Sequence, residues 1–364
     1  MGGVETERYG ALDLIVKTPL GLERIAASRI EELGVECRVH PKPHGFLGLV
    51  IVSGVPEDRK WELAERIKNE VPEVERVLVS EESVKADLDA IVESAVRVSS
   101  RFLDKDTSFA VRTVRRGKHP YTSIDVNCRV GSAIVEALES PVDLESPDKI
   151  VWIEIVGESA AVGVIDGKDI WRKMGPEKVD LRRFFSKVSV VQTPYFGPKN
   201  AIKTVSSRVG RAVQMFEVGE FVIATVGAVD AKQLELFIQG VLEGIESRYS
   251  VQKRIYAYKP RRVKVLVQDL YQLVRDRRGE PKVVFEPEGE PFPKAAGKLA
   301  DILTSSEARV NLLFGSREGI PKGVFRFADL VVDLCPGITL STEYAASSAL
   351  IGLAFAVEEK ATHT

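Results

Sequence analysis

The segment from Arg309 to Glu359 constrains the fold of this chain most strongly, because it combines two short apolar runs with loops of small residues. Both runs, Val310–Phe314 and Leu330–Leu334, are apolar at consecutive positions, as in strands that are buried on both faces. Thr342 is the expected N-cap of a following helix, whose almost wholly apolar body, Ala345–Val357, predicts burial on all sides. Parallel sheets bind ligands at the carboxyl ends of their strands, so we expect a ligand cleft here.

The loops after the two runs offer backbone groups to a ligand. The first, which we call the glycine loop, is Gly315–Gly323 and has three glycines that allow close approach to backbone amides. The second is Cys335–Ile338. Neither matches the glycine fingerprint of dinucleotide sites or the phosphate-binding loop, so the glycines alone do not identify the ligand.

Length and composition limit the classes of protein to consider. The 364 residues suffice for two or three domains, and the net charge of −2 means that a nucleic-acid partner must meet local basic patches. Three scattered cysteines argue against a disulfide framework or a cysteine zinc site and fit a reducing cytoplasm. We expect no export signal, no membrane-spanning segment and no metal site. The cysteines are Cys37, Cys128 and Cys335, and the equally scattered histidines are His40, His44, His119 and His363.

The first half of the chain predicts two small α+β domains. Residues 1–82 show strand and helix patterns in the order βαββαβ, the ferredoxin-like arrangement, and residues 83–174 show a helix, a strand, a helix and two strands. The elements expected in the first domain are Leu12–Lys17, Gly21–Leu33, Val35–His40, Phe46–Val52, Glu57–Asn69 and Val74–Ser80. Those expected in the second domain are Leu88–Phe102, Ser108–Val114, Ser123–Ala137, Ile150–Val156 and Ser159–Ile165.

A basic stretch without acids lies between the first strand and the second helix of residues 83–174. From Thr107 to Ile124 there are four basic side chains, mixed with aromatic and hydroxyl groups. A solvated loop explains such a charge run equally well. Arginines and an aromatic ring beside a helix N-terminus suit phosphate contacts and base stacking, so we predict RNA binding. The candidates are Arg112, Arg115, Arg116, Lys118, His119, Tyr121 and Thr122.

The run FAVRTVRRGKHPYTSIDVNCRVGSAI, followed by VDLESPDKIVWIEIVGESAAVGV, resembles a THUMP domain. The basic RRGKHPYT loop, Gly131 in the next helix and the DLESPD turn occur in the order of that family. The resemblance implies a module of RNA-modifying enzymes that binds the 3′ acceptor end of tRNA. A ferredoxin-like domain is its usual companion.

The second half of the chain predicts an α/β domain. Residues 175–187 read as a basic linker, and residues 188–364 alternate strands and helices as in a mostly parallel, doubly wound sheet. Within them, Ser247–Lys264 holds seven basic residues, no acid and three tyrosines. As a helix this segment would form a dimer or domain contact; as a loop it would clamp RNA, and we favour RNA contact through Arg261 and Arg262.

The C-terminal half resembles a SPOUT methyltransferase through LLFGSREGIP and VVDLCPGITLSTEYAASSALIGL. The resemblance implies a C-terminal trefoil knot, S-adenosylmethionine bound in the loops of the knot, and a homodimer that completes the active site. The cofactor-binding residues that it implies are Leu313, Phe314, Gly315, Ser316, Glu318, Gly319, Leu334, Cys335, Pro336, Gly337, Ile338 and Leu340.

Methyl transfer from a sulfonium requires a nucleophile held in line and a means of lowering its proton affinity. For a ribose 2′-hydroxyl, a positioned guanidinium stabilises the developing alkoxide. Ribose-methylating SPOUT enzymes carry Asn and then Arg on the first helix of this domain, and Asn200 and Arg208 are the closest match. Arg317 in the glycine loop is a further candidate, and Ser341 stands where the best-known ribose-methylating branch has asparagine.

The domain combination resembles archaeal tRNA 2′-O-methyltransferases that act on nucleotide six of the acceptor stem. An α+β half, ferredoxin-like plus THUMP, would thus precede an α/β SPOUT domain. Two alternatives stay open: a SPOUT base methyltransferase on tRNA or rRNA, and a tRNA-binding protein without catalytic activity.

Overall fold

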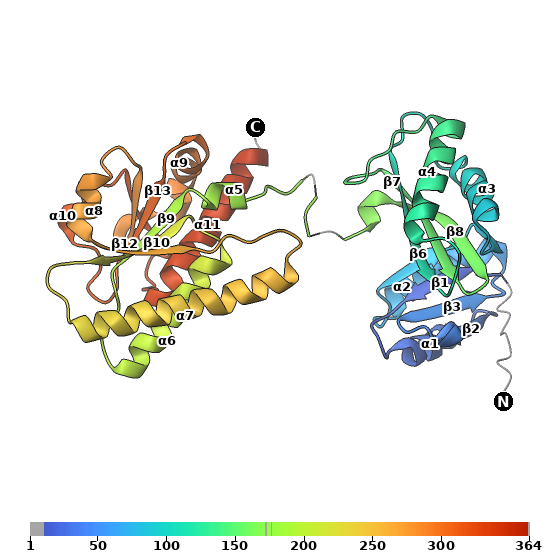
Figure 1. The fold of residues 1–364 in the computed structure, drawn as a ribbon, viewed down its shortest axis with the longest axis horizontal. Coiled ribbons are helices and arrows are strands. Elements are labelled where there is room, and N and C mark those ends of the chain that lie inside the picture. The colour runs from blue at the N-terminus through green and yellow to red at the C-terminus, as the bar shows by residue number, and fades with distance from the viewer. Residues whose placement is uncertain (1–10, 172, 176, 363–364) are drawn as a thin grey trace. The chain divides into compact units, whose positions relative to one another are not determined.

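The computed structural model describes residues 11–171, 173–175 and 177–362, and His363 lies outside them. The chain forms two compact units, Met1–Pro176 and Glu177–Thr364, which we describe separately (Figure 1).

The first unit contains two four-stranded sheets. The N-terminal sheet has the order β2-β3-β1-β4 with antiparallel neighbours throughout, and helices α1 and α2 cover one face of it. This is the expected ferredoxin-like order. The bounds are β1 Leu14–Lys17, α1 Glu23–Glu32, β2 Arg38–Pro41, β3 Leu49–Ser53, α2 Lys60–Glu70 and β4 Arg76–Val79, with short 3-10 turns at Pro43–Gly45 and Glu57–Arg59.

The second sheet has the order β5-β8-β7-β6, in which only β6 and β7 are parallel. Helices α3 and α4 pack on one face. The edge strand β5 was not predicted, because its four residues carry charges at both ends. The bounds are β5 Glu82–Lys85, α3 Leu88–Ser99, β6 Phe109–Arg116, α4 Ser123–Leu138, β7 Lys149–Val156 and β8 Ser159–Asp166, followed by a 3-10 turn at Gly167–Asp169.

The two sheets of the first unit pack against each other through the faces that the helices leave uncovered. Alternation along each strand sends one set of side chains to the helices and the other set to this seam. On β1, for example, Leu14 and Val16 contact the helices, whereas Ile15 joins Ile150 and Trp152 of β7 at the seam. The seam therefore joins the two small domains into one compact unit through packed side chains.

The second unit holds a six-stranded sheet in the order β11-β10-β9-β13-β12-β14, with every neighbouring pair parallel. Helices α6, α7, α9 and α11 cover one face, and α8 and α10 cover the other (Figure 1). The expected doubly wound, parallel sheet is confirmed. The bounds are α5 Arg182–Phe185, β9 Val188–Gln192, α6 Lys199–Met215, β10 Glu220–Thr225, α7 Ala231–Ile255, β11 Lys264–Asp269, α8 Leu270–Asp276, β12 Lys282–Pro291, α9 Phe292–Ser305, β13 Val310–Phe314, α10 Lys322–Phe325, β14 Leu330–Asp333 and α11 Thr342–Thr362.

Several details of the second unit differ from the sequence expectations. Residues 177–187 belong to this unit, since Phe184 and Phe185 of α5 are buried in its core. The basic segment is neither one helix nor one loop: α7 continues to Ile255, a short loop follows, and β11 begins at Lys264. Strand β11 lies at the edge of the sheet, where its alternating side chains need only partial burial.

The final helix is not buried on all sides. Ile351 is 47% exposed and Phe355 is 67% exposed, while alanines and leucines fill the opposite face. The sequence of an apolar helix does not show which face of the helix packs against the rest of the chain and which face stays exposed. Thr342 is the first residue of α11 instead of its cap, and the Ser341 carbonyl accepts the amide hydrogen bonds of Tyr344 and Ala345. Strand order alone does not define how the chain threads, so the trefoil knot stays a prediction.

Candidate active site

A cleft of about 350 Å³ opens at the carboxyl ends of β12, β13 and β14. The glycine loop and the loop after β14 form two of its walls, and the residues after Phe285 of β12 form the third. The predicted cofactor residues that line the cleft are Gly315, Ser316, Glu318, Gly319, Leu334, Cys335, Ile338 and Leu340. The cleft lies where the parallel-strand pattern indicated.

The backbone of the glycine loop is held by hydrogen bonds to side chains from two neighbouring strands. Thr193 Oγ1 accepts the Ser316 amide at 2.7 Å, and Glu286 Oε1 accepts the Ile320 amide at 2.6 Å. A Cβ atom on Gly315 would overlap the Gly319 Cα atom and the Glu286 carboxylate. Position 315 therefore requires glycine because the backbone and a carboxylate already fill the space.

Glu286 was not among the predicted site residues. Burial raises the pKa of its carboxyl group, while the hydrogen bond from the Ile320 amide acts in the opposite direction. The available signal was its position directly after the buried run of β12, next to two strands that end in small-residue loops. With Glu288, Glu318 and Asp333 it makes the cleft acidic, against Arg317 as the only lining cation among the described residues.

The other predicted cofactor residues occupy different positions. Leu313 and Phe314 are buried in the two cores on either side of β13, where the Phe314 ring stacks on that of Phe285 with centroids 5.0 Å apart. Pro336 and Gly337 are exposed at the tip of the second loop. These four residues shape the strand and the turn without lining the cleft.

Arg208 contacts the first turn of α11, and Ser341 directly precedes that helix. Arg208 Nη1 lies 3.1 Å from Glu343 Oε1, two residues after Ser341, and about half of the Arg208 side chain is exposed. Gln192 at the end of β9 donates to the Thr342 carbonyl at 2.9 Å, which fixes this start. The structure thus places an arginine beside the loop that ends in Leu340 and Ser341.

The remaining catalytic candidates lie in two other places. Arg317 lines the cleft, and its guanidinium stands 5.1 Å from the centre of the Tyr195 ring. Asn200 is exposed in the first turn of α6. Arg211, one turn beyond Arg208, donates to Ser247 of α7 and so points toward the neighbouring helix.

The basic loop of the first unit, counted together with Arg112, Arg115 and Arg116 at the end of β6, uses many of its side chains internally. Arg116 pairs with the buried Glu154, and Arg112 donates to the Leu144 carbonyl at 2.7 Å. His119 bonds the Gly157 carbonyl at 2.7 Å.

Of the other side chains of this loop, most are also bonded within the first unit and one is exposed. Tyr121 is buried and donates to the Ala86 carbonyl at 2.6 Å, and Thr122 caps α4 in a capping box. Arg115 contacts the Gly117 carbonyl, also within the loop, whereas Lys118 is exposed. The RNA-binding candidates therefore include several residues that hold the loop itself.

The basic segment of the second unit is also anchored. Tyr258 donates to Glu217 at 2.7 Å, and the Arg182 guanidinium lies 4.1 Å from the centre of its ring. Burial, and then the bond to Glu217, raise the pKa of Tyr258 to about 12. Arg261 and Arg262 are exposed, and Arg262 pairs with Glu246 at 3.1 Å.

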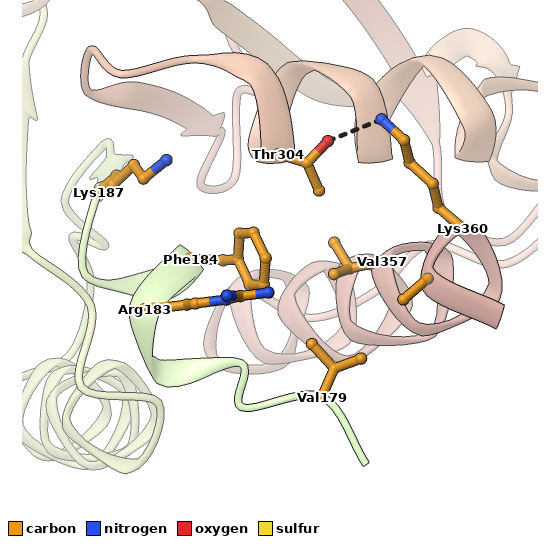
Figure 2. Close-up of a pocket in the computed structure, with 8 residues that line it drawn as sticks. Val179, Arg183, Phe184, Lys187, Thr304, Val357 and Lys360 are labelled. Atoms are coloured by element: carbon orange, nitrogen blue, oxygen red, sulfur yellow. Dashed lines mark hydrogen bonds between the residues drawn. The ribbon is translucent and has the colours of Figure 1, made fainter. Parts of the chain in front are cut away.

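A separate hollow of about 440 Å³ lies between α5 and the C-terminal ends of α9 and α11 (Figure 2). Its lysines are engaged: Lys187 donates to the Ser306 carbonyl at 2.7 Å and Lys360 to Thr304 at 2.8 Å. Helix C-termini carry partial negative charge, which these cations balance. The hollow is thus a place where basic side chains cap helix ends.

Neither a cluster of metal ligands nor a membrane-spanning helix is found in residues 11–171, 173–175 and 177–362. Within these ranges no group of three or more His, Cys, Asp or Glu side chains is arranged to hold a metal ion. No helix in them is both long enough and apolar enough to span a membrane.

Comparison with known proteins identifies relatives of both halves. Residues 85–165 match the THUMP domain, and residues 182–364 match the family described as AF2226-like SPOUT RNA methylase fused to THUMP. The uncharacterized protein MJ0421 of Methanocaldococcus jannaschii is 39% identical over 344 residues, which cover 94% of this chain and 93% of that protein.

Other relatives match smaller parts. A tRNA (guanine(6)-N2)-methyltransferase of M. jannaschii is 28% identical over 44% of this chain and 42% of its own length. A probable tRNA sulfurtransferase of the same organism is 42% identical over 21% of each chain. Among solved structures, PH1313 of Pyrococcus horikoshii has a TM-score of 0.36 and 19% identity, covering 92% of this chain and 97% of its own. By the family match and the full-length relative, this chain belongs to the AF2226-like SPOUT RNA methylases fused to THUMP.

Proposed function

We propose that the chain is an S-adenosylmethionine-dependent tRNA 2′-O-methyltransferase that acts in the acceptor stem, at nucleotide six. The observation that carries the proposal is the cleft, because both small-residue loops and Arg317 line it. Arg208 of α6 pairs with Glu343 at the start of α11, the helix that follows the second loop.

The cleft suits the cofactor in charge and in shape. S-adenosylmethionine carries a sulfonium and an ammonium group, which Glu286, Glu288, Glu318 and Asp333 attract. Backbone amides of the loops and the apolar side chains of Leu334, Ile338 and Leu340 suit an adenine ring. When bound, the cofactor supplies an activated methyl group.

For the ribose, Arg208 is the proposed catalytic residue. Its guanidinium would donate to the 2′-oxygen and stabilise the negative charge that develops as the 2′-proton passes to water and the methyl group bonds to the oxygen, while Glu343 holds the side chain in place. Asn200, Ser341 and Arg317 would position the nucleotide. Arg208→Ala should lower kcat and leave cofactor affinity unchanged, and Arg211→Ala, on the same helix, is the matched control. If only Arg211→Ala lowered kcat, the catalytic role would belong to Arg211 and not to Arg208.

The THUMP domain is proposed to hold the 3′ end of the tRNA and to act as a ruler. Two relatives that share this part of the chain are named as tRNA-modifying enzymes, and one of them is named for position six. That relative aligns with 44% of the chain and is named for methylation of a guanine N2 atom. It therefore supports nucleotide six as the target position and does not support the 2′-oxygen as the methylated atom.

We also propose a homodimer formed through the second unit. The support is the exposed apolar stripe of Tyr344, Ile351 and Phe355 on α11, since a second copy would cover side chains that this chain leaves in water.

Incubation with methyl-labelled cofactor and tRNA, followed by mapping of the label, tests the proposal. We expect the label on the 2′-oxygen of nucleotide six. Label on a base would establish the alternative base methyltransferase. Label on competing rRNA fragments would identify rRNA, instead of tRNA, as the substrate. Tight tRNA binding without cofactor binding would favour the non-catalytic alternative.

A further inference from the structure

The seam between the two sheets of the first unit contains a further cavity, of about 430 Å³. Strand alternation sends four cations to this side of the sheets: Lys17 of β1, Arg76 of β4, and Arg112 and Arg116 of β6. Lys17, Arg76 and Arg112 line the cavity, and Arg116 reaches Glu154 at its edge.

The carboxylates nearby do not balance this charge. Glu154 is 2% exposed and is shared by Arg116 and by Lys17, whose Nζ atom lies 2.5 Å from Glu154 Oε1. Glu145 is the other lining acid among the described residues. Four cations thus face two carboxylates, and the cavity attracts anions.

Two of the cations oppose each other directly. Lys17 and Arg76 are partners across the antiparallel β1–β4 pair, where like charges destabilise a sheet. Burial, followed by the charges of Arg116 and Arg76, lowers the pKa of Lys17 to about 7. A bound anion would relieve the repulsion and restore the proton of Lys17.

A buried aromatic ring also lines this region. Trp152 is 4% exposed and is one of the side chains that form the cavity wall. The apolar wall beside it, Leu78, Ile150 and Ile170, suits a planar base.

We propose that this seam cavity binds one nucleotide, with its phosphate among Lys17, Arg76 and Arg112 and its base against the apolar wall. The hollow at α5 does not rival it, since it lies at the C-terminal ends of α9 and α11, and helix C-termini disfavour anions. If the nucleotide belongs to RNA, the inference deepens the proposed function by giving the first unit a site that holds one unpaired residue of the substrate.

The test uses Trp152 as the reporter in the full chain. Trp61→Phe and Trp171→Phe leave it as the sole tryptophan, since the chain has three. Its fluorescence is followed during titration with a single-stranded RNA tetramer without terminal phosphates, with AMP and with inorganic phosphate. We expect saturable quenching by the RNA tetramer, weaker at pH 8 than at pH 6, because the phosphodiesters do not titrate in this range while Lys17 loses its proton.

Arg76→Gln is the decisive variant, because the residue is exposed and opposes a like charge. It should weaken tetramer binding by about tenfold and leave the thermal midpoint equal or higher. Arg29→Gln, on α1 at the other face of the sheet, removes the same charge and should change nothing.

Each outcome decides between sources or refutes the site. Saturation by AMP and not by RNA supports the cavity with a free nucleotide as its ligand. Equal affinity for inorganic phosphate, or equal affinity of wild type and Arg76→Gln, overturns the proposal. The titration needs no cofactor, so its failure and a failure of methyl transfer are separate results.

Discussion

The glycine loop of the second unit and the basic loop of the first unit both stand out in the sequence, yet their residues are used in different ways. In the glycine loop, the backbone is the functional surface: Gly315 is required by the close approach of Gly319 and Glu286, and Gly319 adopts a positive φ of 70° that favours glycine. In the basic loop, Arg116, His119 and Tyr121 bind other parts of the same unit. A glycine that must be glycine is thus more informative than a basic side chain, which serves equally well in folding and in binding.

The largest expected effect concerns the structural role of the basic loop. Glu154→Gln leaves Lys17 and Arg116 without their shared carboxylate, so the free energy of unfolding of the first unit should fall by about 3–5 kcal/mol. Urea denaturation followed by Trp152 fluorescence measures it. Glu82→Gln, which removes an exposed ion pair with Arg97, should cost less than about 1 kcal/mol. Equal losses would mean that the buried ion pairs do not stabilise the unit.

The second prediction concerns the glycine loop. Gly315→Ala introduces a Cβ atom where Gly319 and Glu286 already lie, so the loop must shift and cofactor affinity should fall roughly 10- to 100-fold. Calorimetric titration with S-adenosylmethionine measures it. Gly323→Ala, whose Cβ atom would have its nearest neighbour, Arg326, at 3.9 Å, should bind normally. Normal binding by both variants would remove the loop from the cofactor site.

The third prediction separates stability from binding within the cleft. Because burial raises the pKa of Glu286, its ionisation opposes folding, and stability falls as pH rises from the unfolded pKa through the raised folded pKa. Glu286→Gln lacks this loss and can still accept the Ile320 amide. It should be more stable than the wild type at neutral pH, and the difference should vanish at acid pH, where Glu286 is protonated in both states.

The same variant should bind the cationic cofactor several-fold more weakly, because one carboxylate of the cleft is lost. Thermal unfolding from pH 4 to 8 and cofactor titration measure the two effects. A variant that loses both stability and affinity would show that the carboxylate holds the loop instead of attracting the ligand.

The sequence predicted the fold where one physical signal dominated. Alternating or continuous apolar runs located most strands, whereas the edge strands β5 and β11 were missed because exposure at an edge weakens that signal. Glu286 was missed because its role depends on β13 lying beside β12, a pairing between residues far apart in the chain. The seam cavity has the same origin, since Lys17 and Arg112 belong to different sheets.

The smallest expected effect tests whether any part of the basic loop is left for RNA. Lys118 is exposed, so Lys118→Ala should weaken tRNA binding about threefold, reduce the salt slope by about one and leave stability unchanged. Filter binding at several salt concentrations measures both quantities. Lys105→Ala, an exposed lysine elsewhere in the first unit, is the control for loss of charge. If the two variants behave alike, the loop contributes only general charge, and its arginines, histidine and tyrosine serve the fold.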